Sequence, residues 1–162
     1  MDENFTRKHK LIEEITNKAW FANPAGRQGY EVILLEKVGD GGTRFYTSLK
    51  PGGKLGFAER LMGSFIAYAV DIRHARSFPV SGQFNTSDRG RKITLSVEVH
   101  FHVTDARIVA METVDPLGEL YTKVVAALNR ELHRHEESKI TSSLVEEIIE
   151  GVGLVPHLGL VI

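Results

Sequence analysis

Three residues with metal-binding side chains alternate in the middle of the chain: Glu98, His100 and His102. Residues two apart on an extended strand point to the same face, so these two imidazoles and one carboxylate share a side. Histidine and glutamate are zinc ligands, so the set is a candidate metal site, and a small metal-dependent enzyme or ligand-binding domain built on it is the alternative function. The favoured interpretation is that the three residues form the water-facing side of an amphipathic strand, where any polar side chain serves.

Other sequence patterns that could form a metal-binding or catalytic site are weaker. His133 and Glu137 are four residues apart and could share a helix face, but the number of ligands is low and a charged helix terminus is the favoured interpretation. The chain has no cysteine and no Gly-x-Ser-x-Gly motif, so it lacks the usual signatures of a thiol or serine nucleophile. The run Gly52-Gly53-Lys54 lacks the spacing of a phosphate loop. We interpret four aspartates as turn and cap residues: Asp71, Asp88, Asp105 and Asp115.

The candidate metal residues lie on the clearest strand of the sequence. From Ile93 to Val103, apolar residues alternate strictly with polar ones, which predicts a strand with one face on a core. Asp115-Pro116 then starts a helix, because aspartate suits the N-cap and proline suits the first helical position. Apolar residues three or four apart follow along this helix and form one stripe, which we expect to be an interaction surface. The stripe consists of Leu117, Leu120, Tyr121, Val124, Leu128 and Leu132.

Hydrophobic periodicity and turn residues predict the remaining elements. Residues 4–21 read as an amphipathic N-terminal helix, and residues 61–70 as a buried strand or a short helix. Residues 77–82 read as a loop or an edge segment, because Pro79 cannot donate to a sheet ladder. The other expected elements are a hairpin of residues 31–38 and 44–47, a strand at 68–73, a helix at 141–150 and a last strand at 154–162.

Composition limits the class of protein. The 162 residues suffice for one globular domain, and a formal net charge of −1 argues against nucleic acid as a partner. No apolar run approaches the ~20 residues that span a bilayer, and no signal peptide is present, so we expect a cytoplasmic protein. The final strand runs to the last residue without a polar tail, which favours a domain cut from a longer protein.

The order of these elements resembles the SPFH domain, also called the band 7 or stomatin/prohibitin/flotillin domain. Residues 47–53 resemble the family's early L-x-P-G turn after a hairpin, and residues 68–73 resemble its V-D-x-R strand. Residues 85–105 resemble its T-x-D turn and long strand ending in V-x-D. Downstream, residues 124–130 match a V-x-x-A-L-R pattern, and residues 153–155 match the start of the last strand.

The resemblance covers residues 29–162 and divides the chain into an N-terminal helix and linker (1–28) and an SPFH-like domain. It implies an α+β fold, with a mostly antiparallel twisted sheet packed by amphipathic helices. It further implies a non-enzymatic scaffold, without a cofactor, that self-associates into homo-oligomers. Membrane lipid or a membrane protein would be reached peripherally, through segments outside this chain. The family's membrane hairpin and its following coiled coil have no counterpart in these 162 residues.

Overall fold

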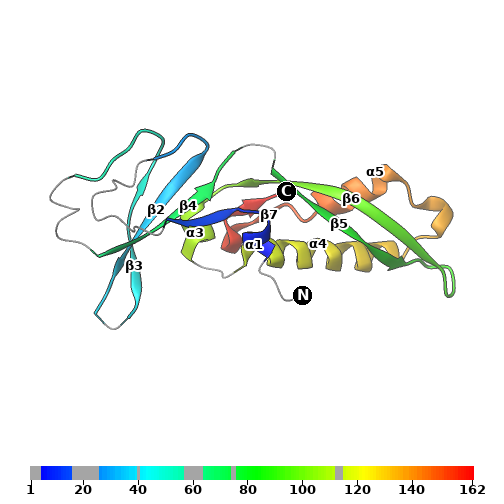
Figure 1. Cartoon of the computed structure of the whole chain (residues 1–162). Helices are drawn as coiled ribbons and strands as arrows, with labels where there is room; N and C mark the ends of the chain where they lie inside the picture. Colours follow the sequence, from blue (N-terminus) through cyan, green and yellow to red (C-terminus); the bar gives the residue numbers. More distant parts are fainter. Residues whose placement is uncertain (1–4, 16–25, 40, 57–63, 74–75, 112–114) are drawn as a thin grey trace.

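The computed structural model describes residues 5–15, 26–39, 41–56, 64–73, 76–111 and 115–162. They form two four-stranded antiparallel sheets, with the two longest helices packed beside the second sheet (Figure 1). The α+β class expected from the sequence is confirmed, although the strands form two sheets instead of one.

The first sheet has the strand order β1-β4-β2-β3. A hairpin at one edge of this sheet joins β2 to β3 through a tight turn in which Gly41 adopts φ +84°, as the sequence predicts. The strands are β1 (Ile12–Ile15), β2 (Tyr30–Lys37), β3 (Thr43–Leu49) and β4 (Phe65–Asp71).

The second sheet is dominated by a long two-stranded ribbon and has the order β5-β6-β8-β7. Pro79 lies within β5, a strand with a free outer edge among the described residues, so the edge alternative for residues 77–82 is the right one. The strands are β5 (Arg76–Asn85), β6 (Lys92–Val103), β7 (Leu154–Val155) and β8 (Leu160–Val161).

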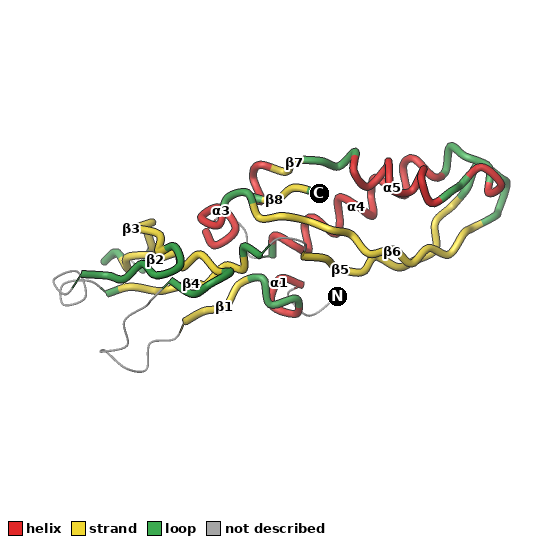
Figure 2. Tube along the Cα trace, turned by 90° about the horizontal axis from the view of Figure 1, so that it is seen from above, coloured by secondary structure: helices red, strands yellow, loops and turns green. Residues whose placement is uncertain are grey.

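The helices α4 and α5 lie on one side of the β5–β6 ribbon (Figure 2). The helix predicted from Asp115-Pro116 is α4, and the Asp115 side chain accepts a hydrogen bond from the Gly118 backbone N–H. The helices are α1 (Phe5–Lys8), α3 (Ala106–Met111), α4 (Pro116–Leu132) and α5 (Ser142–Glu150), with short 3-10 turns η1 (Glu137–Lys139) and η2 (Pro156–Leu158).

Two expectations about the ends are wrong. The helix expected at 4–21 is only four residues long in α1, and Ile12–Ile15 form β1, which pairs antiparallel with β4. Residues 4 and 16–21 of that expected helix lie outside the described residues. The last strand at 154–162 is divided into β7 and β8, because Pro156 starts a 3-10 turn and Gly159 reverses the chain at φ +65°.

The main core joins the two sheets. Leu11, Ile33 and Val70 from the first sheet region share one cluster with Phe78, Val99 and the buried face of α4. A smaller cluster lies on the other face of the first sheet, around Val32, Leu34 and Leu49. Phe5, Leu11 and Ile12, which precede Tyr30, therefore contribute to the same core as the helix α4.

Candidate functional site

The structure places Glu98, His100 and His102 on the exposed face of β6, as the amphipathic alternative predicts. Glu98 accepts a hydrogen bond of 2.7 Å from the Ser77 hydroxyl on the neighbouring strand. Within the described residues, no three His, Asp or Glu side chains come together in a group that could hold a metal ion. The pair His133 and Glu137 is also separated, since Glu137 lies in η1 and forms an ion pair with Arg91.

The apolar stripe of residues 117–132 is used inside the fold. Five of its six side chains are fully buried between α4 and the sheets: Leu117, Leu120, Val124, Leu128 and Leu132. Tyr121 is partly buried and packs its ring against Phe5 and Phe78. The stripe therefore presents no surface to a partner, because α1, β5 and α5 already cover it.

Asp71 is the residue whose role differs most from its sequence interpretation. Its carboxylate is fully buried at the end of β4 and pairs with Arg73 and, at 2.9 Å, with Arg76 of β5. Burial alone would raise the pKa of Asp71, but hydrogen bonds from Arg73 and the charge of Arg76 hold that pKa below its usual range. Because Arg76 also donates to the His9 carbonyl, this cluster joins both sheets to the N-terminal segment.

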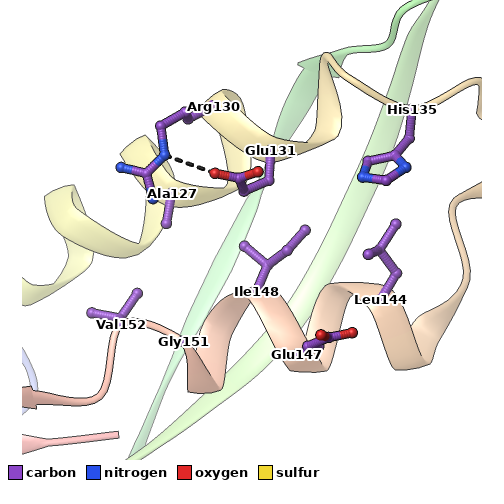
Figure 3. A pocket seen from close by; sticks show the side chains of 9 residues that line it. All are labelled: Ala127, Arg130, Glu131, His135, Leu144, Glu147, Ile148, Gly151 and Val152. Carbon is purple, nitrogen blue, oxygen red and sulfur yellow. Dashed lines mark hydrogen bonds and ion pairs between the residues drawn. The ribbon is translucent and has the colours of Figure 1, made fainter.

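A first hollow lies between α4 and α5 and has a volume of about 460 Å³. Figure 3 shows Glu131, His135, Leu144 and Ile148 around it, with the Arg130–Glu131 ion pair on its rim. Arg130 and Arg134 both contact Glu131, and the hydrogen bond from Arg130 is the main cause of a lowered Glu131 pKa. Of the two glutamates that line the hollow, Glu131 and Glu147, the first is thus already paired with arginines of its own chain.

A second groove, of about 480 Å³, lies between β6 and α5. Five consecutive residues of β6, 94–98, line it together with α5. Successive side chains of a strand point to opposite faces, so a hollow that touches all five lies along the strand's edge. Leu95 and Val97 of β6 and Val145 and Ile149 of α5 give the groove an apolar wall, and Glu98 and Glu146 lie on its rim.

The edge of β6 beside this groove carries no partner strand in the described structure. β8 pairs with β6 only at His102 and Val103, and the ladder does not continue toward Lys92. The Thr104 N–H donates to the Gly159 carbonyl on the β8 side, at 2.8 Å. Because backbone groups alternate between the two edges of a strand, Thr94, Ser96 and Glu98 also direct their N–H and C=O groups to that side.

The register of β5 against β6 supports the same direction for the backbone groups of β6. Pro79 pairs with Glu98 in the β5–β6 ladder. A proline fits there only if its nitrogen points away from β6, and then the backbone groups of Glu98 point away from β5. The proline was visible in the sequence as an edge signal, but the register that links it to Glu98 was not.

No protein-family model and no curated protein matches this chain. None of the described helices is both long and apolar enough to cross a membrane. The arrangement itself, with an open strand edge next to an apolar groove and an acidic rim, is suited to binding another polypeptide backbone.

Proposed function

We propose that this chain is a non-enzymatic scaffold module of the SPFH type, which works through self-association and partner binding. The resemblance in the order of its sequence motifs supports this function. The observation that carries it is the outer edge of β3, which no other described strand covers, at one end of the elongated molecule (Figure 1). An uncovered strand edge is a template for pairing with another chain.

The β3 edge directs backbone groups outward. Lys37 donates its N–H to Ser64, on the β4 side of β2, so its partner Thr43 faces away from β2 in the same ladder. Large apolar side chains are exposed at this end, with Val38 at 43% and Tyr46 at 38%. A second copy that pairs along β3 would cover these side chains and extend the sheet.

The test is the absolute mass in solution, by light scattering after size-exclusion chromatography over a wide range of protein concentrations. We expect a mass above the 18.1 kDa of the monomer, which rises with protein concentration or reaches a discrete oligomer. Thr43→Pro removes an outward N–H without breaking the bond to β2, and Val38→Glu adds a charge to the same end. Both should lower the mass toward the monomer.

Leu154→Glu is the matched control, because Leu154 is 59% exposed but lies in β7 of the other sheet. It should leave the mass unchanged. A monomer at every concentration, or an oligomer that is insensitive to Thr43→Pro and Val38→Glu, contradicts assembly through this edge.

The proposed scaffold acts in the cytoplasm and is peripheral at a membrane. Contact with lipid or with a membrane protein is assigned to segments outside this chain, in line with the resemblance. Co-sedimentation of the purified chain with anionic lipid vesicles tests this assignment: the chain alone should stay in the supernatant.

A further inference from the structure

We propose that the hollow between α4 and α5 is a docking groove for one amphipathic helix of another protein. The predicted partner helix has an apolar stripe, with acidic residues along one side of the stripe and basic residues along the other. The groove and the β3 edge lie toward opposite ends of the elongated molecule, so this contact does not depend on self-association (Figure 1).

The groove is formed by two helices that run in opposite directions. Ala127 and Val152 lie at one end of it, and His135 and Leu144 lie at the other (Figure 3). Its lining comes from α4, α5 and the residues that directly follow each helix, and not from β6 or β8. Two packed helices leave a furrow between them, into which a third helix fits.

The floor of the groove is apolar. Ala127 is buried there, whereas Leu144, Ile148 and Val152 are only half-buried. Leu144 and Ile148 are one helical turn apart, so they match a partner stripe whose residues recur every three or four positions. Covering these side chains supplies the favourable free energy of docking.

The two walls of the groove differ in charge. On the α4 wall, the Arg130 side chain is 65% exposed and bonds to Glu131 through Nε alone, so its terminal nitrogens remain for a second carboxylate. On the α5 wall, the exposed Glu147 has no ion-pair partner within the described part of the chain. A partner helix with acidic residues toward Arg130 and basic residues toward Glu147 complements both walls.

A second copy of this chain fits the groove less well than a single helix does. A two-fold axis along the groove has two outcomes. Either groove faces groove, which leaves the hollow unfilled, or α5 of the second copy enters the groove beside α5 of the first. Each α5 carries three glutamates and no basic residue, so the second arrangement places like charges side by side.

The probe is a fluorescein-labelled peptide made of three repeats of Ile-Ala-Ala-Leu-Lys-Gln-Glu, held at nanomolar concentration and titrated with the whole chain. This repeat places lysines on one side of an apolar stripe and glutamates on the other. We expect saturable binding by fluorescence anisotropy. A peptide of the same composition, with its isoleucines and leucines spread around the helix, should bind at least about tenfold more weakly.

Two further peptides test the charged walls, one with lysine on both sides of the stripe and one with glutamate on both sides. Wild type should bind each of them about fivefold more weakly than the mixed peptide. Arg130→Glu makes both walls acidic and should prefer the lysine peptide, whereas Glu147→Lys makes both walls basic and should prefer the glutamate peptide.

Glu146→Lys is the matched control for Glu147→Lys. The two residues are adjacent and exposed, but Glu146 lines the groove beside β6. This variant should keep the preference of the wild type for the mixed peptide, although its net charge changes by the same amount. Circular dichroism of each variant verifies the fold.

Four outcomes overturn the proposal. The first is the absence of saturable binding up to millimolar protein, and the second is equal binding of the peptide with the scattered stripe. The third is a peptide preference that Arg130→Glu and Glu147→Lys leave unchanged. The fourth is a dimer that Arg130→Glu dissociates, since a second copy would then occupy the groove.

Discussion

The carboxylate of Asp115 holds Thr6, which precedes it by 109 residues in the chain. It accepts hydrogen bonds from the backbone N–H groups of Phe5 (2.8 Å) and Thr6 (2.7 Å) while also capping α4. The Thr6 hydroxyl donates to the same carboxylate and accepts from the Leu117 N–H. One side chain therefore begins a helix and fixes the N-terminal segment on it.

Asp115→Ala should destabilise the protein by about 2–4 kcal/mol. The lost cap accounts for about 1 kcal/mol, and the buried donors of Phe5 and Thr6 left without an acceptor account for the rest. Urea unfolding monitored by circular dichroism measures the change. Asp105→Ala is the matched control, since the Asp105 side chain caps α3 through the N–H groups of Arg107 and Ile108 but bonds to no distant segment among the described residues. Equal losses in both variants contradict the anchoring role.

Stability should fall in acid because of Asp71 and Asp115. Burial raises the pKa of Asp115, but hydrogen bonds from Thr6, Phe5 and Gly118 outweigh it, so its folded pKa lies below the usual range, as does that of Asp71. A carboxyl group whose pKa is lower in the folded protein than in the unfolded chain stabilises the fold at pH values above the unfolded pKa, which is near 4. This stabilisation is lost as the pH falls through the folded pKa.

The variant Asp71→Asn tests the contribution of Asp71 to this pH dependence of stability. The variant should be less stable than the wild type at pH 7, and the difference should narrow as the pH falls below about 4, because wild-type Asp71 then becomes protonated too. Denaturant unfolding between pH 7 and pH 2 gives the comparison, with Glu14→Gln, on an exposed side chain, as the control for losing one carboxylate. A pH-independent difference argues against the assignment.

Gly159→Ala should be more costly than Gly153→Ala, although both glycines have positive φ, +65° and +60°. An added methyl group at Gly159 would lie 2.4 Å from the Asp105 carbonyl oxygen, whereas at Gly153 the nearest atom is 3.8 Å away. We expect about 1–2 kcal/mol for Gly153→Ala from backbone strain alone, and at least about 2 kcal/mol more for Gly159→Ala. Thermal unfolding of both variants measures the difference, and similar values would contradict the close packing of this turn.

Metal removal tests the alternative function at Glu98, His100 and His102. The three side chains lie in a row on an exposed strand face, so we expect the melting temperature to be the same with zinc and with a chelator. The His100→Ala/His102→Ala variant should behave in the same way. A saturable, one-to-one increase in melting temperature with zinc that disappears in this variant would establish the metal site instead.

Local sequence signals determined much of the fold. The alternation from Ile93 to Val103 gives β6, Asp115-Pro116 gives the start of α4, and the glycines after Val38 give the β2–β3 turn. Each of these signals needs only contiguous residues, because strand alternation, helix capping and turn geometry act over a few positions.

Only the tertiary structure decided which surfaces remain open. The spacing of three between Ile12 and Ile15 favours a helix, but pairing with Ala67–Val70 makes this segment a strand, in which the two side chains join different core clusters. The stripe of α4 reads as a contact surface until α1, β5 and α5 are seen to cover it. Asp71 becomes a buried ion pair because Arg76, on the other sheet, reaches it, and the groove beside Glu98 exists because β8 pairs with only two residues of β6. These outcomes depend on contacts between residues that are far apart in the chain. A short stretch of sequence does not determine them, because the free energies of burial and strand pairing come from both partners.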